Sequence, residues 1–216
     1  MAKGISEFKS KLTRGGARPN LFLVRLNFPN LAGVVDIGSD SSKTATETSE
    51  FLVKTAQIPA SSVGVIEVPY RGRMLKVAGD RTFEPWSVTV VNDGDFNIRK
   101  AFEKWSRGIN AHTENVAQLG YGADGGETYC RDMTVYQLSR DGIKPSKTPA
   151  NIEAPGVDGM DVVRAYRFYD SWPSAISAID LSYESNDQIE EFTVEFQFNY
   201  FEVTKNSLQN LSLIHI

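Results

Sequence analysis

Val77-Ala-Gly-Asp-Arg-Thr-Phe-Glu-Pro-Trp-Ser-Val-Thr-Val-Val-Asn-Asp93 is the stretch of sequence that decides the fold of this chain. Gly79-Asp80 predicts a turn, and Pro85 suits the start of a strand, where its missing N–H does least harm. Asn92-Asp93 predicts the end of that strand and the cap of a following helix. Between them an apolar face alternates with a polar one, which predicts a strand: Trp86, Val88 and Val90 lie on the first face, Ser87 and Thr89 on the second.

The same patterns predict the elements on either side of this stretch. A helix is expected over 95–109, because its apolar residues recur near the 3, 4, 7 spacing of a buried stripe: Phe96, Ile98, Phe102, Trp105 and Ile109. No strand–helix–strand alternation appears, so the fold class is mainly β, an antiparallel sandwich or barrel with one flanking helix. Further strands are expected at 20–28, 51–57, 63–68, 74–77, 129–138, 162–169, 176–184 and 188–203.

The composition fits one domain with extensions. Of the 216 residues, 41% are hydrophobic and the net charge is −4, which excludes a protein that is cationic overall and binds nucleic acid through that charge. The single cysteine excludes an intramolecular disulfide framework and suits a reducing cytoplasm. With neither a signal peptide pattern nor a long apolar run, we expect a soluble protein that does not enter a membrane.

Three segments divide the chain. Residues 1–19 form a basic, glycine-rich arm, which either stays mobile or orders against a neighbouring subunit, and residues 20–203 form the β domain. Polar segments near 31–50 and 139–160 are expected to be long loops, and residues 36–49 look too hydrophilic to pack. In the tail, 204–216, we interpret the last six residues as a translated sequencing adapter, with an apolar tail that docks on a neighbour as the alternative.

No motif predicts a catalytic, metal or cofactor site. The glycine-rich residues 120–126 lack the Lys and Ser/Thr of a phosphate-binding loop, and Asp93-Gly-Asp95 lacks the glutamate that completes a calcium loop. His112 and His215 have no carboxylate or cysteine at ligand spacing. Cys130 lies in a strand pattern with no neighbouring base, so a small buried hydrophobe is expected. An enzyme therefore has no positive support.

Two surfaces could make contacts. The tip that joins strands 63–68 and 74–77 carries Tyr70, Arg71 and Arg73, and it is either a solvated turn or a protruding contact element. The last strand has an apolar face and a polar one. The polar face is solvated in a monomer, but in a ring it could line a channel whose acidic or neutral wall repels DNA phosphates: Glu191, Thr193, Glu195, Gln197 and Asn199, joined by Ser87 and Thr89.

Several blocks, in order over residues 17–203, carry a resemblance. They are Ala17-Arg-Pro-Asn-Leu-Phe22, Ile58-Pro-Ala60, the opening stretch, Trp172-Pro173, and Glu184-Ser-Asn-Asp-Gln-Ile-Glu-Glu-Phe-Thr-Val-Glu195. Together they resemble the tail tube proteins of contractile-tailed (T4-like, myovirus) bacteriophages. The long segments near 31–50 and 139–160 depart from the compact family pattern, and we expect them to decorate the outside or the interfaces of an assembly.

The resemblance implies a structural virion protein with a two-layer β fold and a flanking helix. Its subunits would form hexameric rings, assembled in the host cytoplasm and stacked into a tube inside a contractile sheath. Expected partners are the sheath, baseplate and tape measure proteins. Phage DNA would pass through the lumen without sequence-specific binding, and no cofactor is implied. The hairpin tip and the N-terminal arm would make ring-to-ring contacts.

Three alternatives stay open. The nearest is the inner tube of a type VI secretion or contractile injection system, which delivers protein cargo. A carbohydrate- or ligand-binding β-sandwich is more distant, because the aromatic residues fall mostly on alternating, core-type positions. An enzyme ranks last.

Overall fold

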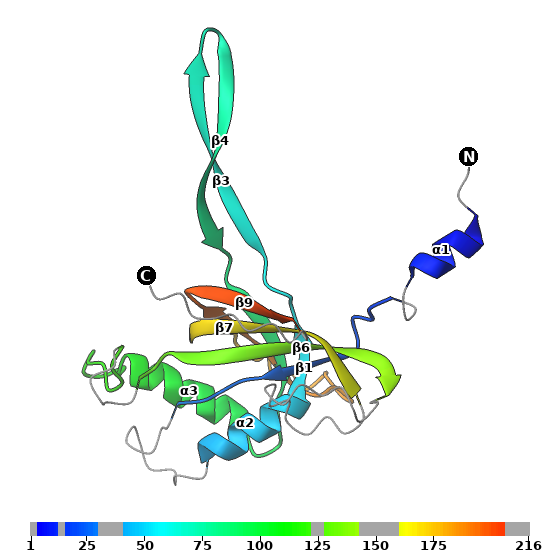
Figure 1. Ribbon diagram of the computed structural model, residues 1–216. Helices are drawn as coiled ribbons and strands as arrows, with labels where there is room; N and C mark the ends of the chain where they lie inside the picture. Colours follow the sequence, from blue (N-terminus) through cyan, green and yellow to red (C-terminus); the bar gives the residue numbers. More distant parts are fainter. Residues whose placement is uncertain (1–3, 13–15, 30–40, 122–127, 143–159, 206–216) are drawn as a thin grey trace.

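Antiparallel strands make up most of the chain in the computed structural model, which describes residues 4–12, 16–29, 41–121, 128–142 and 160–205. This confirms the predicted mainly β fold class. A long hairpin rises from the body, and a short helix stands apart from it (Figure 1). The elements are α1 (Ile5–Lys11), β1 (Phe22–Arg25), α2 (Ser41–Leu52), β2 (Val53–Ala56), β3 (Ser61–Tyr70), β4 (Arg73–Phe83), β5 (Trp86–Val91), α3 (Asn97–Ile109), β6 (Arg131–Gly142), β7 (Met160–Ile176), β8 (Glu191–Gln197) and β9 (Tyr200–Lys205).

Strand β7 bends and thereby joins the two layers of the body. A seven-stranded sheet has the order β1-β6-β7-β8-β5-β2, with β9 paired to β7 off this path. The first part of β7 pairs with β9 and the last part with β8. The bend lies at Asp170, whose φ is 54°, a conformation that an L residue seldom adopts. One layer therefore contains β1, β6, β9 and the start of β7, and the other contains the end of β7, β8, β5 and β2.

Strand β5 forms as predicted and supplies the centre of the core. Trp86, Val88 and Val90 are buried, and the side chains between them are half-buried. The Trp86 ring stacks on Phe168 of β7 with centroids 4.4 Å apart, and its indole N–H donates to the Gln57 carbonyl at 2.8 Å. Trp86 thus connects the two layers and satisfies its only polar atom inside the protein.

The predicted turn at Gly79-Asp80 is wrong. Both residues lie within β4, opposite Gly64 of β3, where the register shifts between Val63 and Val65. Two residues facing one make a β-bulge, which bends a strand and increases its twist. A Cβ on Gly79 would stand 3.2 Å from the Gly64 carbonyl oxygen, so the backbones approach too closely there for a larger residue. The glycine permits a bulge in the hairpin, not the end of a strand.

Helix α3 confirms the predicted amphipathic helix. Of the two residues predicted to cap it, Asp93 does so and Asn92 does not. The Asp93 carboxylate accepts the backbone N–H of Asn97, the first helical residue, at 3.2 Å. Asn92 instead bonds Glu190, through both its backbone N–H and its side-chain amide. Phe96, predicted on the buried stripe, has a φ of 57° and lies exposed before the helix.

The buried stripe of α3 covers the apolar face of β8. Ile98, Phe102 and Trp105 are fully buried. The Phe102 ring meets Phe192 and Phe196 edge-on, with centroids 6.1 and 5.9 Å away. Because this face of the layer is closed by the helix, the opposite face of β5 and β8 is left for other contacts.

Helix α2 corrects the prediction of a polar loop over 36–49 and of a strand from residue 51. The helix begins at Ser41, and Ala45 and Ser49 are buried. The Ser49 hydroxyl donates to the Thr46 carbonyl at 2.7 Å, so burial leaves no unsatisfied hydroxyl. Glu50 lies 3.5 Å from the Arg25 Nε, and burial raises the pKa of its carboxyl. Small polar residues therefore pack here, and the body has a second flanking helix.

The C-terminal half differs from the predicted strand limits. β7 runs continuously to Ile176, and residues 177–190 contain turns but no strand, so the strand predicted at 176–184 is wrong. The strand predicted at 188–203 is divided into β8 and β9 at residues 198–199, which lie opposite the bend of β7. β6 extends to Gly142, into the loop predicted from 139. The predictions for 31–40, 143–159 and 206–216 lie outside the described residues. In the described ranges, no helix has the length and apolarity needed to cross a bilayer.

Candidate assembly surfaces

The β3–β4 hairpin projects from the body with both strands exposed (Figure 1). Its strands pair from Ser61 opposite Phe83 to Tyr70 opposite Arg73. The Phe83 ring anchors the base against Phe198 and Phe201, with centroids 5.7 and 5.5 Å away. A two-stranded ribbon alone is at best marginally stable in water. This length of exposed ribbon therefore favours a partner that covers it.

One face of the hairpin is a continuous apolar surface, which we call the apolar ribbon face. Residues directly opposite each other on antiparallel strands share a face. Ile66 lies opposite Val77 and Val68 opposite Leu75, and these four side chains are between 43% and 60% exposed. The other face is interrupted by the ion pair of Glu67 and Lys76, 3.8 Å apart. A contiguous exposed apolar surface of this kind marks an interaction site.

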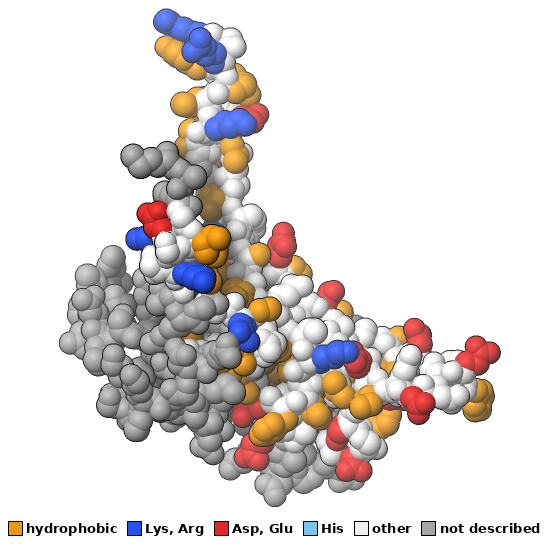
Figure 2. Space-filling view, turned by 90° about the vertical axis from the view of Figure 1, so that its right-hand side faces the viewer, with side chains coloured by type: hydrophobic (Ala, Val, Ile, Leu, Met, Phe, Trp, Pro, Cys, Tyr) orange, Lys and Arg blue, Asp and Glu red, His pale blue; other side chains and the backbone are white. Residues whose placement is uncertain are grey.

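The tip of the hairpin brings together the residues predicted there. Arg71 and Gly72 have φ angles of 47° and 76°. Positive φ at both central residues is the mark of a type I′ turn, which matches the twist of the flanking strands. The Arg71 guanidinium lies 5.3 Å from the centre of the Tyr70 ring, and Arg73 pairs with Tyr70 across the turn. Basic side chains gather at this end of the molecule (Figure 2).

Sequence reasoning identified the tip but missed the apolar ribbon face. The signal was present, because Ile66 and Val68 alternate in one strand and Leu75 and Val77 in the next, around a central glycine at position 72. Pairing the two runs about Arg71-Gly72 would have placed all four residues on one face.

A polar face on β5 and β8 contains most of the predicted polar residues. Ser87 lies opposite Glu195 and Thr89 opposite Thr193, whose hydroxyl oxygens are 3.3 Å apart. This face points away from the core, since the alternate residues of β8 are buried under α3. Glu191 accepts a hydrogen bond from Lys54 of β2 at 2.5 Å, so its charge is paired. We call this surface the β5–β8 polar face.

The remaining two predicted residues lie at the bend. Gln197 ends β8 opposite Trp172. Asn199 follows the strand, and its side-chain amide donates to Asp170 at 3.0 Å and to the Tyr121 hydroxyl at 3.3 Å. Asn199 is exposed but ties the two bent strands together, so the structure gives it a local role besides any role on the β5–β8 polar face.

The residues considered for chemistry do not form a site in the described ranges. No group of three or more His, Cys, Asp or Glu residues there could hold a metal ion. Cys130 is buried as expected, and burial raises the pKa of its thiol to about 11. At neutral pH the thiol is therefore protonated and a poor nucleophile. Residues 122–127 of the glycine-rich segment, and His215, lie outside the described residues.

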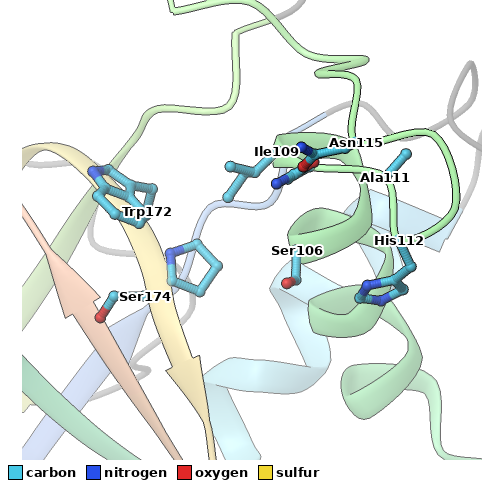
Figure 3. Close-up of a pocket in the computed structure, with 9 residues that line it drawn as sticks. Ser106, Ile109, Ala111, His112, Asn115, Trp172 and Ser174 are labelled. Atoms are coloured by element: carbon cyan, nitrogen blue, oxygen red, sulfur yellow. The ribbon is translucent and has the colours of Figure 1, made fainter.

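A cleft of about 400 Å³ lies between the end of α3 and β7 (Figure 3). Trp172 and Ser174 come from the strand, and Ser106 and Ile109 come from the helix. His112 lies on the helix side, across the cleft from Trp172 (Figure 3). No carboxylate or thiol is among the nine lining residues, whose polar side chains are the imidazole, the hydroxyls of Ser106 and Ser174, and the amides of Asn110 and Asn115.

Comparisons with known proteins show which chains this one resembles. A family model described as phage tail tube protein matches residues 17–204. Tail tube protein gp19 of Enterobacteria phage T4 is 30% identical over 186 residues, which cover 86% of this chain and 91% of the relative. The tail tube protein of Serratia phage KSP90 is 26% identical over 200 residues, which cover 90% and 93%. Among solved structures, a chain from the sheath–tube complex of an extracellular contractile injection system in its extended state gives a TM-score of 0.49 at 12% identity, covering 94% of this chain and 99% of that one.

Proposed function

The chain belongs to the phage tail tube protein family, and on that premise we propose that it is the subunit of a contractile phage tail tube. Hexameric rings of this chain stack into a conduit inside a sheath, and DNA leaves the virion through it. The role is structural, without catalysis or a cofactor. Sheath, baseplate and tape measure proteins are its partners in the tail.

The exposed apolar ribbon face is the observation that carries this proposal. In a monomer the side chains of the apolar ribbon face stay largely in water and contribute little hydrophobic stabilisation. A stacked ring that covers the hairpin removes this apolar area from water and extends the marginal two-stranded ribbon with further contacts. Tyr70, Arg71 and Arg73 then stand at the ring-to-ring contact, where tyrosine and arginine are enriched.

Sheet edges and the N-terminal arm supply further contacts. In the described pairing, β1, β2 and β9 each hydrogen-bond one neighbouring strand, so each leaves an open edge. Neighbours around a closed ring cover such edges and prevent uncontrolled pairing. Helix α1 buries none of its residues, and Ile5 and Phe8 are exposed. We assign α1 to a contact with the adjoining ring.

The β5–β8 polar face is assigned to the lumen. Ser87, Thr89 and Thr193 are uncharged, and Lys54 offsets Glu191, so the wall is neutral to acidic through Glu195. A wall of this kind does not bind phosphates, and DNA slides past it. Gln197 and Asn199 continue the wall toward the bend.

Electron microscopy of the purified full chain tests the proposed function. We expect rings with six-fold symmetry, and tubes as the protein concentration rises. A species that stays strictly monomeric at high concentration, by light scattering and by microscopy, would contradict the proposal.

Replacing Glu195 and Gln197 by lysine should make the tubes bind DNA. The two substitutions add positive charge to a wall whose described side chains include no free cation, so phosphates gain counterion-release binding. Purified variant tubes should retain short single-stranded DNA at about 50 mM salt and release most of it at about 200 mM, whereas unmodified tubes retain none. Fluorescence of labelled DNA that sediments with the tubes measures this. A matched control replaces the exposed Glu114 and Gln118, which lie off this face, by lysine. Equal retention by all three proteins would place the lumen elsewhere.

A further inference from the structure

Residues 179–190 form a second exposed surface, which we call the acidic loop. It follows β7, and three of its apolar side chains are exposed: Leu181 is 81% exposed, Ile189 is 72% exposed, and Tyr183 is fully exposed. Both ends are fixed. Ile179 packs on the core, and Glu190 accepts hydrogen bonds from the backbone and side chain of Asn92. The loop is therefore fixed to the body at both ends, and its exposed apolar groups are not covered within the monomer.

The charge of the acidic loop is opposite to that of the hairpin tip. The loop contains Asp180, Glu184, Asp187 and Glu190 and no lysine or arginine. Among the described residues none forms an ion pair with the first three of these. Arg71 and Arg73 stand at the tip, next to the apolar ribbon face. Each surface thus combines apolar groups with one sign of charge, and the two are complementary.

The positions of the two surfaces place them on different copies of the chain. The hairpin points away from the body, while the chain after β7, drawn in orange, lies on the other side of the sheets (Figure 1). Acidic side chains are spread over the body away from the basic tip (Figure 2). A hairpin therefore cannot fold back onto its own acidic loop. Pairing two hairpins with their tips side by side, in turn, would bring Arg71 and Arg73 of both copies together, which like charges disfavour.

We propose that the apolar ribbon face and basic tip of one copy dock on the acidic loop of a second copy. Ile66, Val68, Leu75 and Val77 cover the apolar side chains of the loop, and Arg71 and Arg73 meet its carboxylates. Because the two surfaces differ, the contact is head-to-tail and repeats from copy to copy, which builds an open stack. The inference rests on the proposed tube function and names the acceptor of its stacking hairpin.

Charge reversal on each side, separately and together, tests the contact. One variant has Arg71→Glu and Arg73→Glu, a second has Asp180→Arg and Glu184→Arg, and a third combines all four. Each reversal alone should raise the protein concentration needed for tubes by at least about tenfold, measured by sedimentation and microscopy. The combined variant should recover most of that loss, because the charges again complement each other. All of these side chains are exposed, and circular dichroism checks that each variant folds.

Asp95→Arg with Glu114→Arg is the matched control for the loop variant, since both residues are exposed acids elsewhere on the body. If the control loses assembly as strongly as the loop variant, net charge is the cause and the inference fails. It also fails if the loop variant assembles like the unmodified chain, or if the combined variant stays as defective as either half. If the unmodified chain forms no rings or tubes, the proposed function itself fails, which is a different outcome.

A cysteine pair gives a second, independent readout. Leu75→Cys combined with Tyr183→Cys should give a ladder of disulfide-linked multimers on non-reducing gels of oxidised tubes, since each copy crosslinks to the next. The native Cys130 is buried and does not compete. Either single variant should stay monomeric on the gel. A dimer of the Leu75→Cys variant alone would mean that hairpins pair with each other, and it would overturn the assignment.

Discussion

Replacement of Trp86 by alanine is expected to lower the free energy of unfolding by about 3–5 kcal/mol. The indole is 2% exposed, stacks on Phe168 at 4.4 Å and donates to the Gln57 carbonyl at 2.8 Å. Alanine leaves a cavity between the two layers and an unsatisfied carbonyl. Since a domain has about 5–15 kcal/mol in total, this loss is a large fraction of the stability. Urea denaturation followed by circular dichroism measures it, and the midpoint of thermal unfolding should fall by roughly 6–20 °C.

Two matched variants separate the contributions of Trp86. Trp86→Phe keeps an aromatic ring against Phe168 but loses the hydrogen bond and some volume, so a smaller loss of about 1–3 kcal/mol is expected. Tyr183→Ala removes a large aromatic side chain that is fully exposed, and it should change stability by no more than about 0.5 kcal/mol. A loss below about 1 kcal/mol for Trp86→Ala would show that the indole does not hold the two layers together.

The parts of the fold that sequence reasoning predicted are those in which one periodicity runs without interruption. In β5 the alternation of Trp86, Val88 and Val90 with polar residues matches burial residue by residue. In α3 the apolar residues share one stripe, and the helix ends at Ile109 as predicted. In such elements the pattern itself reports which side meets the core, because burial on one face repeats with the period of the backbone.

Elements that depend on partners could not be predicted in the same way. The sequence of α2 is mostly Ser, Thr and Glu, and the helix packs through Ala45 and Ser49, which are small enough to lie close to their neighbours. The Gly79 bulge needs the register of β3 against β4, which local sequence does not contain. The bend at Asp170 likewise depends on the partner strand and on the Asn199 amide. Each of these features depends on contacts between residues that are distant in sequence, so local propensity does not predict it.

The candidate surfaces show the same division. Tyr70, Arg71 and Arg73 could be placed at a tip, because glycine and charged residues between two apolar runs mark a hairpin. The apolar ribbon face required the pairing of Ile66 with Val77 and could not be read from either strand alone. Apolar residues on an exposed ribbon look like core residues in a sequence, since only the structure shows that no described element covers them.

Replacing the apolar ribbon face by threonine is expected to abolish assembly and leave the fold intact. The variant has Ile66→Thr, Val68→Thr, Leu75→Thr and Val77→Thr. Threonine has a β-branched side chain suited to a strand, so the hairpin still forms. All four side chains are exposed in the monomer, and the unfolding midpoint should therefore change little. At roughly 1 kcal/mol of lost burial per residue, the contact weakens by about 4 kcal/mol, or about 1,000-fold.

The opposite face of the same hairpin is the matched control for this threonine variant. Val65→Thr with Met74→Thr removes apolar groups that are also exposed, but the Glu67–Lys76 pair lies between them and breaks the apolar surface. This control should form tubes at a concentration within about threefold of the unmodified chain, because it leaves the docking face whole. The comparison decides which face is covered, since both variants alter the same strands and the same monomer surface. Tubes from the four-threonine variant at the unmodified concentration would show that the apolar ribbon face lies outside the stacking contact.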